Sequence, residues 1–212
     1  MTQGSKDFGA LLQPSSLVLI ILDHQDDFLA ALSGSTRQSL SDSTAVLARI
    51  ATACGVSVEL SSLVSETFTG RTWPRLKDLL PGHRAIDRRT INCWEDATFV
   101  EAIKRLKKDR LLVTGLWTEA GVSFAALSAL ELGYEVFLAT DASAGMSIGS
   151  HETAIQRMVQ AGVVPVTWRQ LLFEWYRAVG EKDTKSGEAL IEIAREHGYL
   201  LPDRQSDGLS RD

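Results

Sequence analysis

The chain has 212 residues, a formal net charge of −5 and a hydrophobic fraction of 44%. This length is enough for one α/β domain that buries a complete sheet between two helical layers. The acidic charge and the lack of long Lys/Arg blocks argue against a nucleic-acid partner or an anionic membrane surface. We therefore expect one domain over residues 1–201 and a polar tail at 202–212.

Two further features concern the compartment. The first residues lack the basic and then apolar build of a signal peptide, and no apolar run reaches the ~20 residues that cross a bilayer. Cys54 and Cys93 are the only cysteines, so the chain has no disulfide framework. We expect a cytoplasmic protein.

The spacing of apolar residues predicts alternating strands and helices. Residues 16–22 form a continuous apolar run, which is typical of a parallel strand covered on both faces. The further strands expected are 56–60, a short one near 85–86, 110–114, 135–139 and 163–164. The helices expected are 41–53, 73–80, 98–107, 120–132, 150–161, 168–178 and 185–197. This order predicts an α/β fold, a Rossmann-like three-layer αβα sandwich around a mostly parallel six-stranded sheet.

Asp23 is the first candidate functional residue, because it directly follows the first apolar strand. Ligands of open parallel sheets bind at the carboxyl ends of strands, near the point where strand order reverses. A poorly solvated acid can have its pKa shifted for acid or base catalysis, although an aspartate here could also cap a helix. His24, Asp26 and Asp27 suggest a metal site, but the chain has no second histidine at ligand spacing. We expect no metal and, without a glycine-rich phosphate loop, no nucleotide cofactor.

Three segments resemble one enzyme family. They are Asp23-His24-Gln25-Asp26-Asp27-Phe28, the run from Arg88 to Asp96, which reads RRTINCWED, and the run from Gly115 to Leu130, which reads GLWTEAGVSFAALSAL. They are similar to motifs of the isochorismatase-like cysteine hydrolases, and most of all to the YcaC-like branch. The similarity extends over roughly residues 16–178.

The resemblance implies roles for individual residues. Asp23 matches the catalytic aspartate, and Arg88 matches its basic partner, with Arg89 as the adjacent alternative and two surface arginines as the other interpretation. The main-chain amides of Trp117 and Gly121 match the oxyanion hole. The family also has a non-proline cis peptide, which would fall at Leu116–Trp117.

Gly121 stands where most of the family has its nucleophilic cysteine. A glycine cannot form a covalent thioester, so that route is closed at this position. Three interpretations stay open: acid-catalysed hydrolysis of a vinyl ether, as in the true isochorismatases; base-catalysed, non-covalent hydrolysis of an amide or imide; and a pseudoenzyme that keeps the pocket for binding.

Other residues of the matched segments complete the candidate site. We assign substrate binding to Asn92, Trp94, Trp117 and Thr118; the two tryptophans would form a flat apolar wall or else pack in the core. Cys93 could be a relocated thiol, and Ser123 a helix cap or a group that reaches the vacated space.

The expected partners are a small-molecule substrate and further copies of the chain. The apolar side chains of residues 168–176 exceed what a small domain must bury, which predicts a homo-oligomer.

Overall fold

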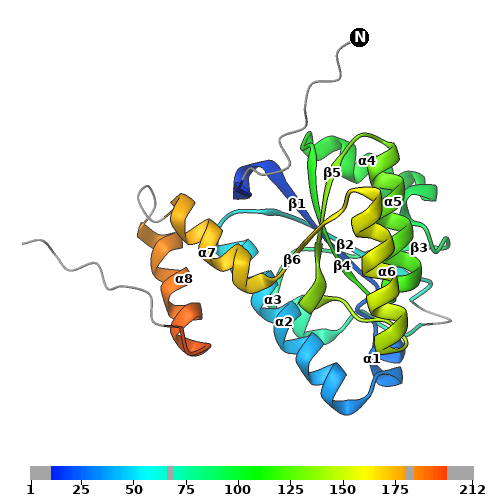
Figure 1. Cartoon of the computed structure of the whole chain (residues 1–212), viewed down its shortest axis with the longest axis horizontal. Helices are drawn as coiled ribbons and strands as arrows, with labels where there is room; N and C mark the ends of the chain where they lie inside the picture. Colours follow the sequence, from blue (N-terminus) through cyan, green and yellow to red (C-terminus); the bar gives the residue numbers. More distant parts are fainter. Residues whose placement is uncertain (1–10, 66–68, 180–183, 200–212) are drawn as a thin grey trace, which may run out of the picture.

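The computed structural model describes residues 11–65, 69–179 and 184–199 and contains one parallel six-stranded sheet (Figure 1). The strands are β1 (Leu17–Leu22), β2 (Ser57–Leu63), β3 (Ile86–Arg88), β4 (Arg110–Gly115), β5 (Glu135–Ala139) and β6 (Val164–Val166). Their order is β3-β2-β1-β4-β5-β6, and every neighbouring pair is parallel. The predicted α/β sandwich is confirmed.

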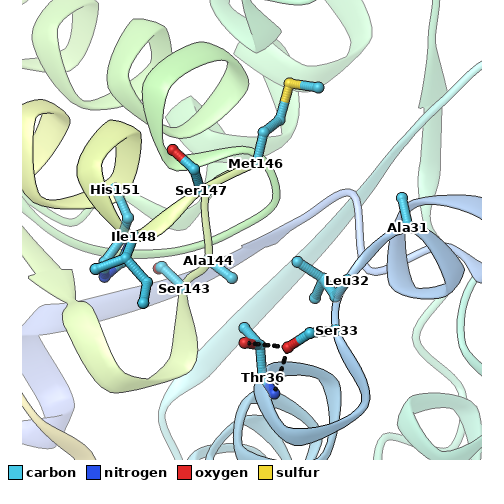
Figure 2. A pocket seen from close by; sticks show the side chains of 11 residues that line it. Ala31, Leu32, Ser33, Thr36, Ser143, Ala144, Met146, Ser147, Ile148 and His151 are labelled. Atoms are coloured by element: carbon cyan, nitrogen blue, oxygen red, sulfur yellow. Dashed lines mark hydrogen bonds between the residues drawn. The ribbon is translucent and has the colours of Figure 1, made fainter.

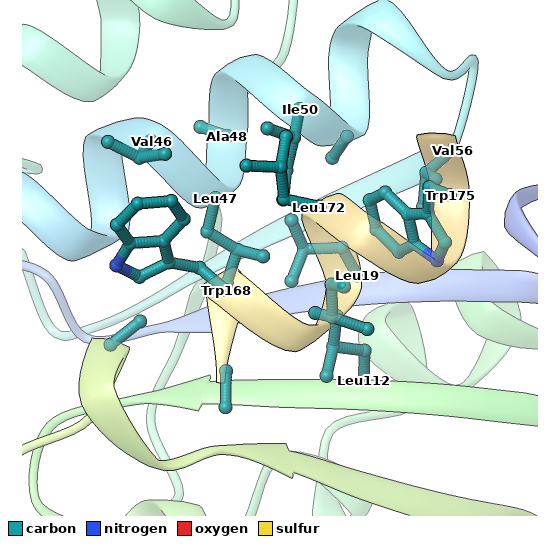
Figure 3. Close-up of a cluster of buried hydrophobic side chains, with 14 of the residues drawn as sticks. Leu19, Val46, Leu47, Ala48, Ile50, Val56, Leu112, Trp168, Leu172 and Trp175 are labelled. Carbon is teal, nitrogen blue, oxygen red and sulfur yellow. The ribbon is translucent and has the colours of Figure 1, made fainter. Parts of the chain in front are cut away.

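Helices cover both faces of the sheet. They are α1 (Asp26–Ala31), α2 (Gly34–Ala53), α3 (Pro74–Leu79), α4 (Ala97–Leu106), α5 (Ser123–Glu131), α6 (Ile148–Ala161), α7 (Trp168–Val179) and α8 (Thr184–Glu196). Helices α2, α3, α7 and α8 pack on one face, and α4, α5 and α6 pack on the other. Figure 3 shows the first of these cores, where Trp168 and Trp175 pack between α2 and the sheet.

The apolar run of β1 is explained by this layering. Leu17, Leu19 and Ile21 face the α2 side, whereas Val18, Ile20 and Leu22 face the α5 side. Because side chains of a strand alternate between faces, a strand covered on both faces must be apolar at every position. All six residues are buried.

Several element boundaries differ from the predictions. Helix α2 begins at Gly34 rather than at 41, because the Ser33 hydroxyl accepts a hydrogen bond from the Thr36 N–H (3.3 Å) and caps the helix. The apolar pattern did not indicate helix α1. The predicted helix 120–132 is divided into a π-helical turn, Thr118–Val122, and α5.

Most of the apolar side chains of residues 168–176 are buried within the chain and do not form the exposed surface that we predicted. Trp168, Leu171, Leu172 and Trp175 are buried against α2 and α8, and Phe173 alone of the described α7 side chains is a large exposed hydrophobic. The reason is α8, which packs against both α7 and α2 and covers this face. No helix in the described ranges is long and apolar enough to cross a membrane. The polar tail expected at 202–212 lies outside the described residues.

Two strands at the centre of the sheet set the position of the site. Strand order reverses between β1 and β4, and the residues after these strands are Asp23 and Leu116. Gly115 ends β4 where a Cβ atom would lie 2.5 Å from the Leu22 carbonyl oxygen. Only a glycine allows the two strand ends to approach this closely.

Candidate active site

Asp23 and Arg88 form a buried ion pair at the carboxyl edge of the sheet. Arg88 Nη1 donates to Asp23 Oδ1 (2.6 Å), and Arg88 Nη2 donates to Asp23 Oδ2 (2.5 Å). Arg88 is fully buried, and Asp23 is 2% exposed. A second bond from Arg88 Nη2 reaches the Ile91 carbonyl oxygen (3.2 Å). Both carboxylate oxygens therefore face one guanidinium in a bidentate arrangement.

Strand geometry explains which residues meet here. Asp23 follows β1 in a left-handed conformation (φ 59°), and its N–H donates to the Ser61 carbonyl of β2 (2.9 Å). Arg88 ends β3, and the next residue, Arg89, is exposed. The structure thus selects Arg88 rather than Arg89. The capping alternative for Asp23 is wrong, because the N-cap of α1 is Gln25.

Burial and charge act on Asp23 in opposite directions. Burial raises the pKa of the Asp23 carboxyl, and the charge and hydrogen bonds of Arg88 lower it. Burial has the larger effect, so the resulting pKa is about 7, compared with an ordinary value of 3.8. Desolvation favours the neutral form of an acid, and a nearby cation favours its charged form. The pKa of this carboxyl group therefore lies above that of an exposed aspartate and closer to the range suited to acid or base catalysis.

Gly121 faces this pair directly. A Cβ atom at position 121 would lie 3.1 Å from Asp23 Oδ2, 3.6 Å from Arg88 Nη2 and 3.7 Å from the Ile91 carbonyl oxygen. Because glycine has no Cβ, this space beside the carboxylate contains no protein atom of residue 121. Any reacting group there must come from solvent or from a ligand.

The loop before Gly121 has the predicted backbone. The Leu116–Trp117 peptide bond is cis, as the resemblance implied. Among the described residues, the Trp117 N–H donates to no protein acceptor, whereas the Trp117 carbonyl accepts from Ala120 and Val122. The Trp117 ring lies against Phe28 of α1, with centroids 5.6 Å apart. The Trp117 amide is thus available to a ligand.

Thr118 is held by a histidine that the sequence did not indicate. The Thr118 hydroxyl lies 2.8 Å from His151 Nδ1, and the Thr118 N–H donates to the Ala144 carbonyl (3.0 Å). Burial lowers the pKa of His151, against the opposing charges of Glu119 and Glu152. Because Thr118 is fully buried, its side chain anchors the loop to α6.

Two residues predicted to bind substrate have other contacts. Asn92 Oδ1 accepts from the Trp94 N–H (3.2 Å), and Asn92 Nδ2 donates to Ser128 Oγ (3.0 Å). The Trp94 indole N–H donates to the Ala125 carbonyl (2.8 Å), and its ring packs on Tyr134 and Phe99. The ring and the indole N–H of Trp94 are therefore both used in contacts within the protein. The packing alternative holds for Trp94.

The alternatives for Cys93 and Ser123 are decided by burial and by a hydrogen bond, respectively. Cys93 is fully buried, and burial raises the pKa of its thiol to about 12, so it stays protonated and is a poor nucleophile. The Ser123 hydroxyl donates to the Thr118 carbonyl (2.6 Å). Ser123 therefore neither caps α5 through its oxygen nor reaches the space at Gly121.

The residues after Asp23 support the site. His24 is buried; its Nδ1 lies 3.1 Å from the Leu22 carbonyl and its Nε2 lies 3.0 Å from Thr44 Oγ1. Burial lowers the His24 pKa to about 4. Gln25 donates to the Gly70 carbonyl (2.8 Å) and accepts from the Leu63 N–H (2.8 Å). These side chains connect the end of β1 to α2 and to the loop after β2.

A cavity of about 360 Å³ lies beyond the Trp117 loop (Figure 2). Its walls come from the end of α1 to the start of α2 and from the segment before α6 to the first turn of α6, including Leu32, Ala144, Met146 and His151. The Thr118–His151 contact and the Thr118–Ala144 hydrogen bond connect this cavity to the loop that carries Trp117. None of Asp23, Arg88, Trp117 and Gly121 is among its lining residues.

Fold and site together define a class of protein. A Rossmann-like parallel sheet carries a buried carboxylate and its arginine at the topological switch point, beside a loop with an available main-chain amide. The model of the isochorismatase domain matches residues 17–170. The chain belongs to the isochorismatase family.

Similar proteins place it in the YcaC branch of that family. The probable hydrolase YcaC of Escherichia coli (strain K12) is 30% identical over 167 residues, which is 78% of this chain and 80% of YcaC. The crystal structure of that protein, described as an octameric hydrolase of unknown specificity, superposes with a TM-score of 0.79 at 29% identity over 86% of this chain and 89% of the other. YcaC from Pseudomonas aeruginosa gives a TM-score of 0.78 at 28% identity over 87% of this chain and 92% of the other.

Proposed function

We propose that this protein is a hydrolase that cleaves a vinyl ether or an amide or imide C–N bond of a small metabolite without a covalent intermediate. Asp23 is the acid or base, Arg88 its cationic partner, and the amides of Trp117 and Gly121 bind the developing oxyanion. The observation that carries the proposal is the space at Gly121, next to the Asp23 carboxylate. A water molecule or substrate atom in that space lies within reach of Asp23 Oδ2.

The chemistry balances in two versions. With protonated Asp23, the carboxyl gives its proton to the vinyl-ether carbon. Water then adds to the oxocarbenium ion and returns a proton to the Asp23 carboxylate, and the hemiketal breaks into a carbonyl compound and an alcohol. With ionised Asp23, the carboxylate takes a proton from water, hydroxide adds to the amide carbon, and the leaving nitrogen takes that proton back. Both versions use Asp23 for the proton transfers, whereas the amides of Trp117 and Gly121 bind an oxyanion only in the second version. No side chain at 121 takes part in either.

The pH profile separates these versions. Burial raises the pKa of Asp23 to about 7. Acid catalysis then loses rate as the pH rises through 7, whereas base catalysis gains rate over the same interval. A substrate carboxylate near Arg88 would weaken the pairing with Asp23 and favour the protonated form.

A second candidate is a binding protein without turnover. It is favoured by one observation: Arg88 donates to both oxygens of Asp23, which restrains the carboxylate and occupies one acceptor site of each oxygen. A binding protein would keep its ligand affinity and show no product at any pH.

We also infer a homo-oligomer. The YcaC relative from Escherichia coli is octameric. In this chain Met146 and Ile148 are exposed by 74% and 77%, although both are large apolar side chains that line the cavity in Figure 2. Light scattering on the eluting protein would show a mass several times 23.2 kDa, and a monomer would refute the inference.

Product formation tests the enzymatic proposal. The purified protein is incubated with enol-ether acids, small amides and cyclic imides, and products are identified by mass spectrometry. Asp23→Asn should abolish turnover, and Asp26→Asn, an equal change at an exposed position three residues away, should retain it. Equal activity of Asp23→Asn and the parent protein would overturn the proposed role.

A further inference from the structure

A second cavity, of about 390 Å³, lies beside β2, β3 and α3 and is lined by four basic side chains: Arg71, Lys77, His83 and Arg84. They come from three separate segments: the loop after β2, helix α3, and the loop before β3. Three permanent cations around one cavity are unexpected in a chain whose net charge is −5. The Asp23–Arg88 site does not include any of them.

These basic groups are not neutralised by the protein. Within residues 11–65, 69–179 and 184–199, no ion pair and no side-chain hydrogen bond involves any of the four. Of the four, His83 acts on one acid outside the cavity: burial raises the pKa of Glu59, and the charges of His83 and Arg105 lower it. The donors of the four basic groups therefore point to solvent or to a ligand.

Asp87 is the one carboxylate that the described residues contribute to the cavity wall, and it already accepts hydrogen bonds from the protein. Asp87 Oδ1 accepts from Ser62 Oγ (3.0 Å) and from the Ser65 N–H (2.9 Å). Alternation along β3 explains its position, because Asp87 faces this cavity while the next residue, Arg88, faces Asp23. The candidate active site and this cavity thus lie on opposite faces of one short strand.

Another cavity with arginines shows the contrast. It lies between α2, α3 and α8, and its Arg49 and Arg75 are paired with Glu196 and Asp42. Those arginines already have protein anions as partners. The cavity beside β3 has an excess of unpaired cations instead.

We propose that the cavity beside β3 binds the phosphate group of a small phosphorylated molecule. Guanidinium and ammonium groups are the usual partners of phosphate oxygens, and guanidinium binds two oxygens at once. The hydroxyl of Ser65 and that of Thr72 line the same cavity and add neutral donors. A small ligand is favoured over a nucleic acid, because an acidic protein repels a polyanion that extends beyond four basic residues.

Calorimetric titration of the full-length protein with inorganic pyrophosphate tests this site without any assay of hydrolysis. We expect a dissociation constant below ~1 mM in low salt, which weakens as salt screens the charges. The double variant Lys77→Gln/Arg84→Gln should lose at least ~10-fold in affinity. Asp87→Asn should bind pyrophosphate more tightly, because it removes a negative charge from the wall.

The matched control is Arg75→Gln, which removes one positive charge from the same helix as Lys77 but outside this cavity. Its pyrophosphate affinity should equal that of the parent protein. Phenyl phosphate is titrated in parallel as an esterified phosphate. Tighter binding of phenyl phosphate would indicate a phosphate ester as the ligand, and tighter binding of pyrophosphate would indicate a free inorganic phosphate. Absence of pyrophosphate binding, an equal loss in Arg75→Gln, or tighter binding of a single-stranded RNA would overturn the proposal.

Discussion

Two bidentate arginine–carboxylate pairs in this molecule have nearly the same geometry and opposite surroundings. Arg88 meets Asp23 with distances of 2.6 and 2.5 Å, and Arg49 meets Glu196 with distances of 2.5 and 3.0 Å. The first pair has side chains exposed by 0% and 3%, the second by 33% and 43%. Burial is therefore the variable that separates them.

The difference shows what an ion pair does in each setting. Water screens the exposed pair, so it adds little stability and serves mainly as a contact between α2 and α8. The buried pair has lost its hydration, and neither charge tolerates the loss of the other. The desolvation cost of a buried pair offsets much of its attraction, so the pair contributes little net stability. It does hold the Asp23 carboxyl group in a fixed position next to the space at Gly121.

The largest effect expected comes from breaking the buried pair. Arg88→Met leaves Asp23 buried without a cation, which should lower the free energy of unfolding by ~3–5 kcal/mol at pH 8 in urea denaturation. Arg89→Met changes the exposed neighbour and should stay within ~0.5 kcal/mol. If both variants lose the same stability, Arg88 has no special role in the fold.

Filling the space beside the pair should impair turnover more than stability. Gly121→Ala places a Cβ 3.1 Å from Asp23 Oδ2 and should lower kcat/KM by ~10- to 100-fold once a substrate is known, which is ~1.4–2.7 kcal/mol of lost transition-state stabilisation. Gly149→Ala is the control, because a Cβ there meets nothing within 4 Å. Undiminished activity of Gly121→Ala would mean that the reaction does not use this space.

The buried pair should also make the free energy of unfolding depend on pH. Because burial raises the pKa of Asp23 from 3.8 to about 7, the folded state holds this proton more tightly than the unfolded state does. The resulting stability is present below pH 4 and is lost as the pH rises to about 7. The unfolding free energy of the parent protein minus that of Asp23→Asn should therefore fall over this interval and stay constant above it. A difference that rises instead would show that Arg88 outweighs burial.

The smallest effect belongs to the exposed pair. Arg49→Gln should cost ~0–1 kcal/mol of unfolding free energy, and 1 M salt should remove most of that difference. The same salt should leave the cost of Arg88→Met nearly unchanged, because the buried pair is shielded from ions. A salt-insensitive loss above ~2 kcal/mol for Arg49→Gln would contradict the comparison.

Local sequence was sufficient to predict the strands and Asp23, and resemblance to the family indicated Arg88 as a candidate. The continuous apolar run 17–22 can be buried on both faces only in a covered parallel sheet, and an acid at its end must lie at the carboxyl edge. Resemblance to the family then indicated the Trp117–Gly121 loop. These features depend on short-range pattern, so the order of residues along the chain is enough to predict them.

Contacts between distant segments decided the rest. Whether Arg88 or Arg89 meets Asp23 depends on the pairing of β3 with β2, and the orientation of Trp94 depends on Tyr134 and Ala125. His151 approaches Thr118 from α6, and Lys77, Arg71 and Arg84 converge from three segments. Sequence spacing contains no information about such convergence, because the protein must fold before these side chains become neighbours.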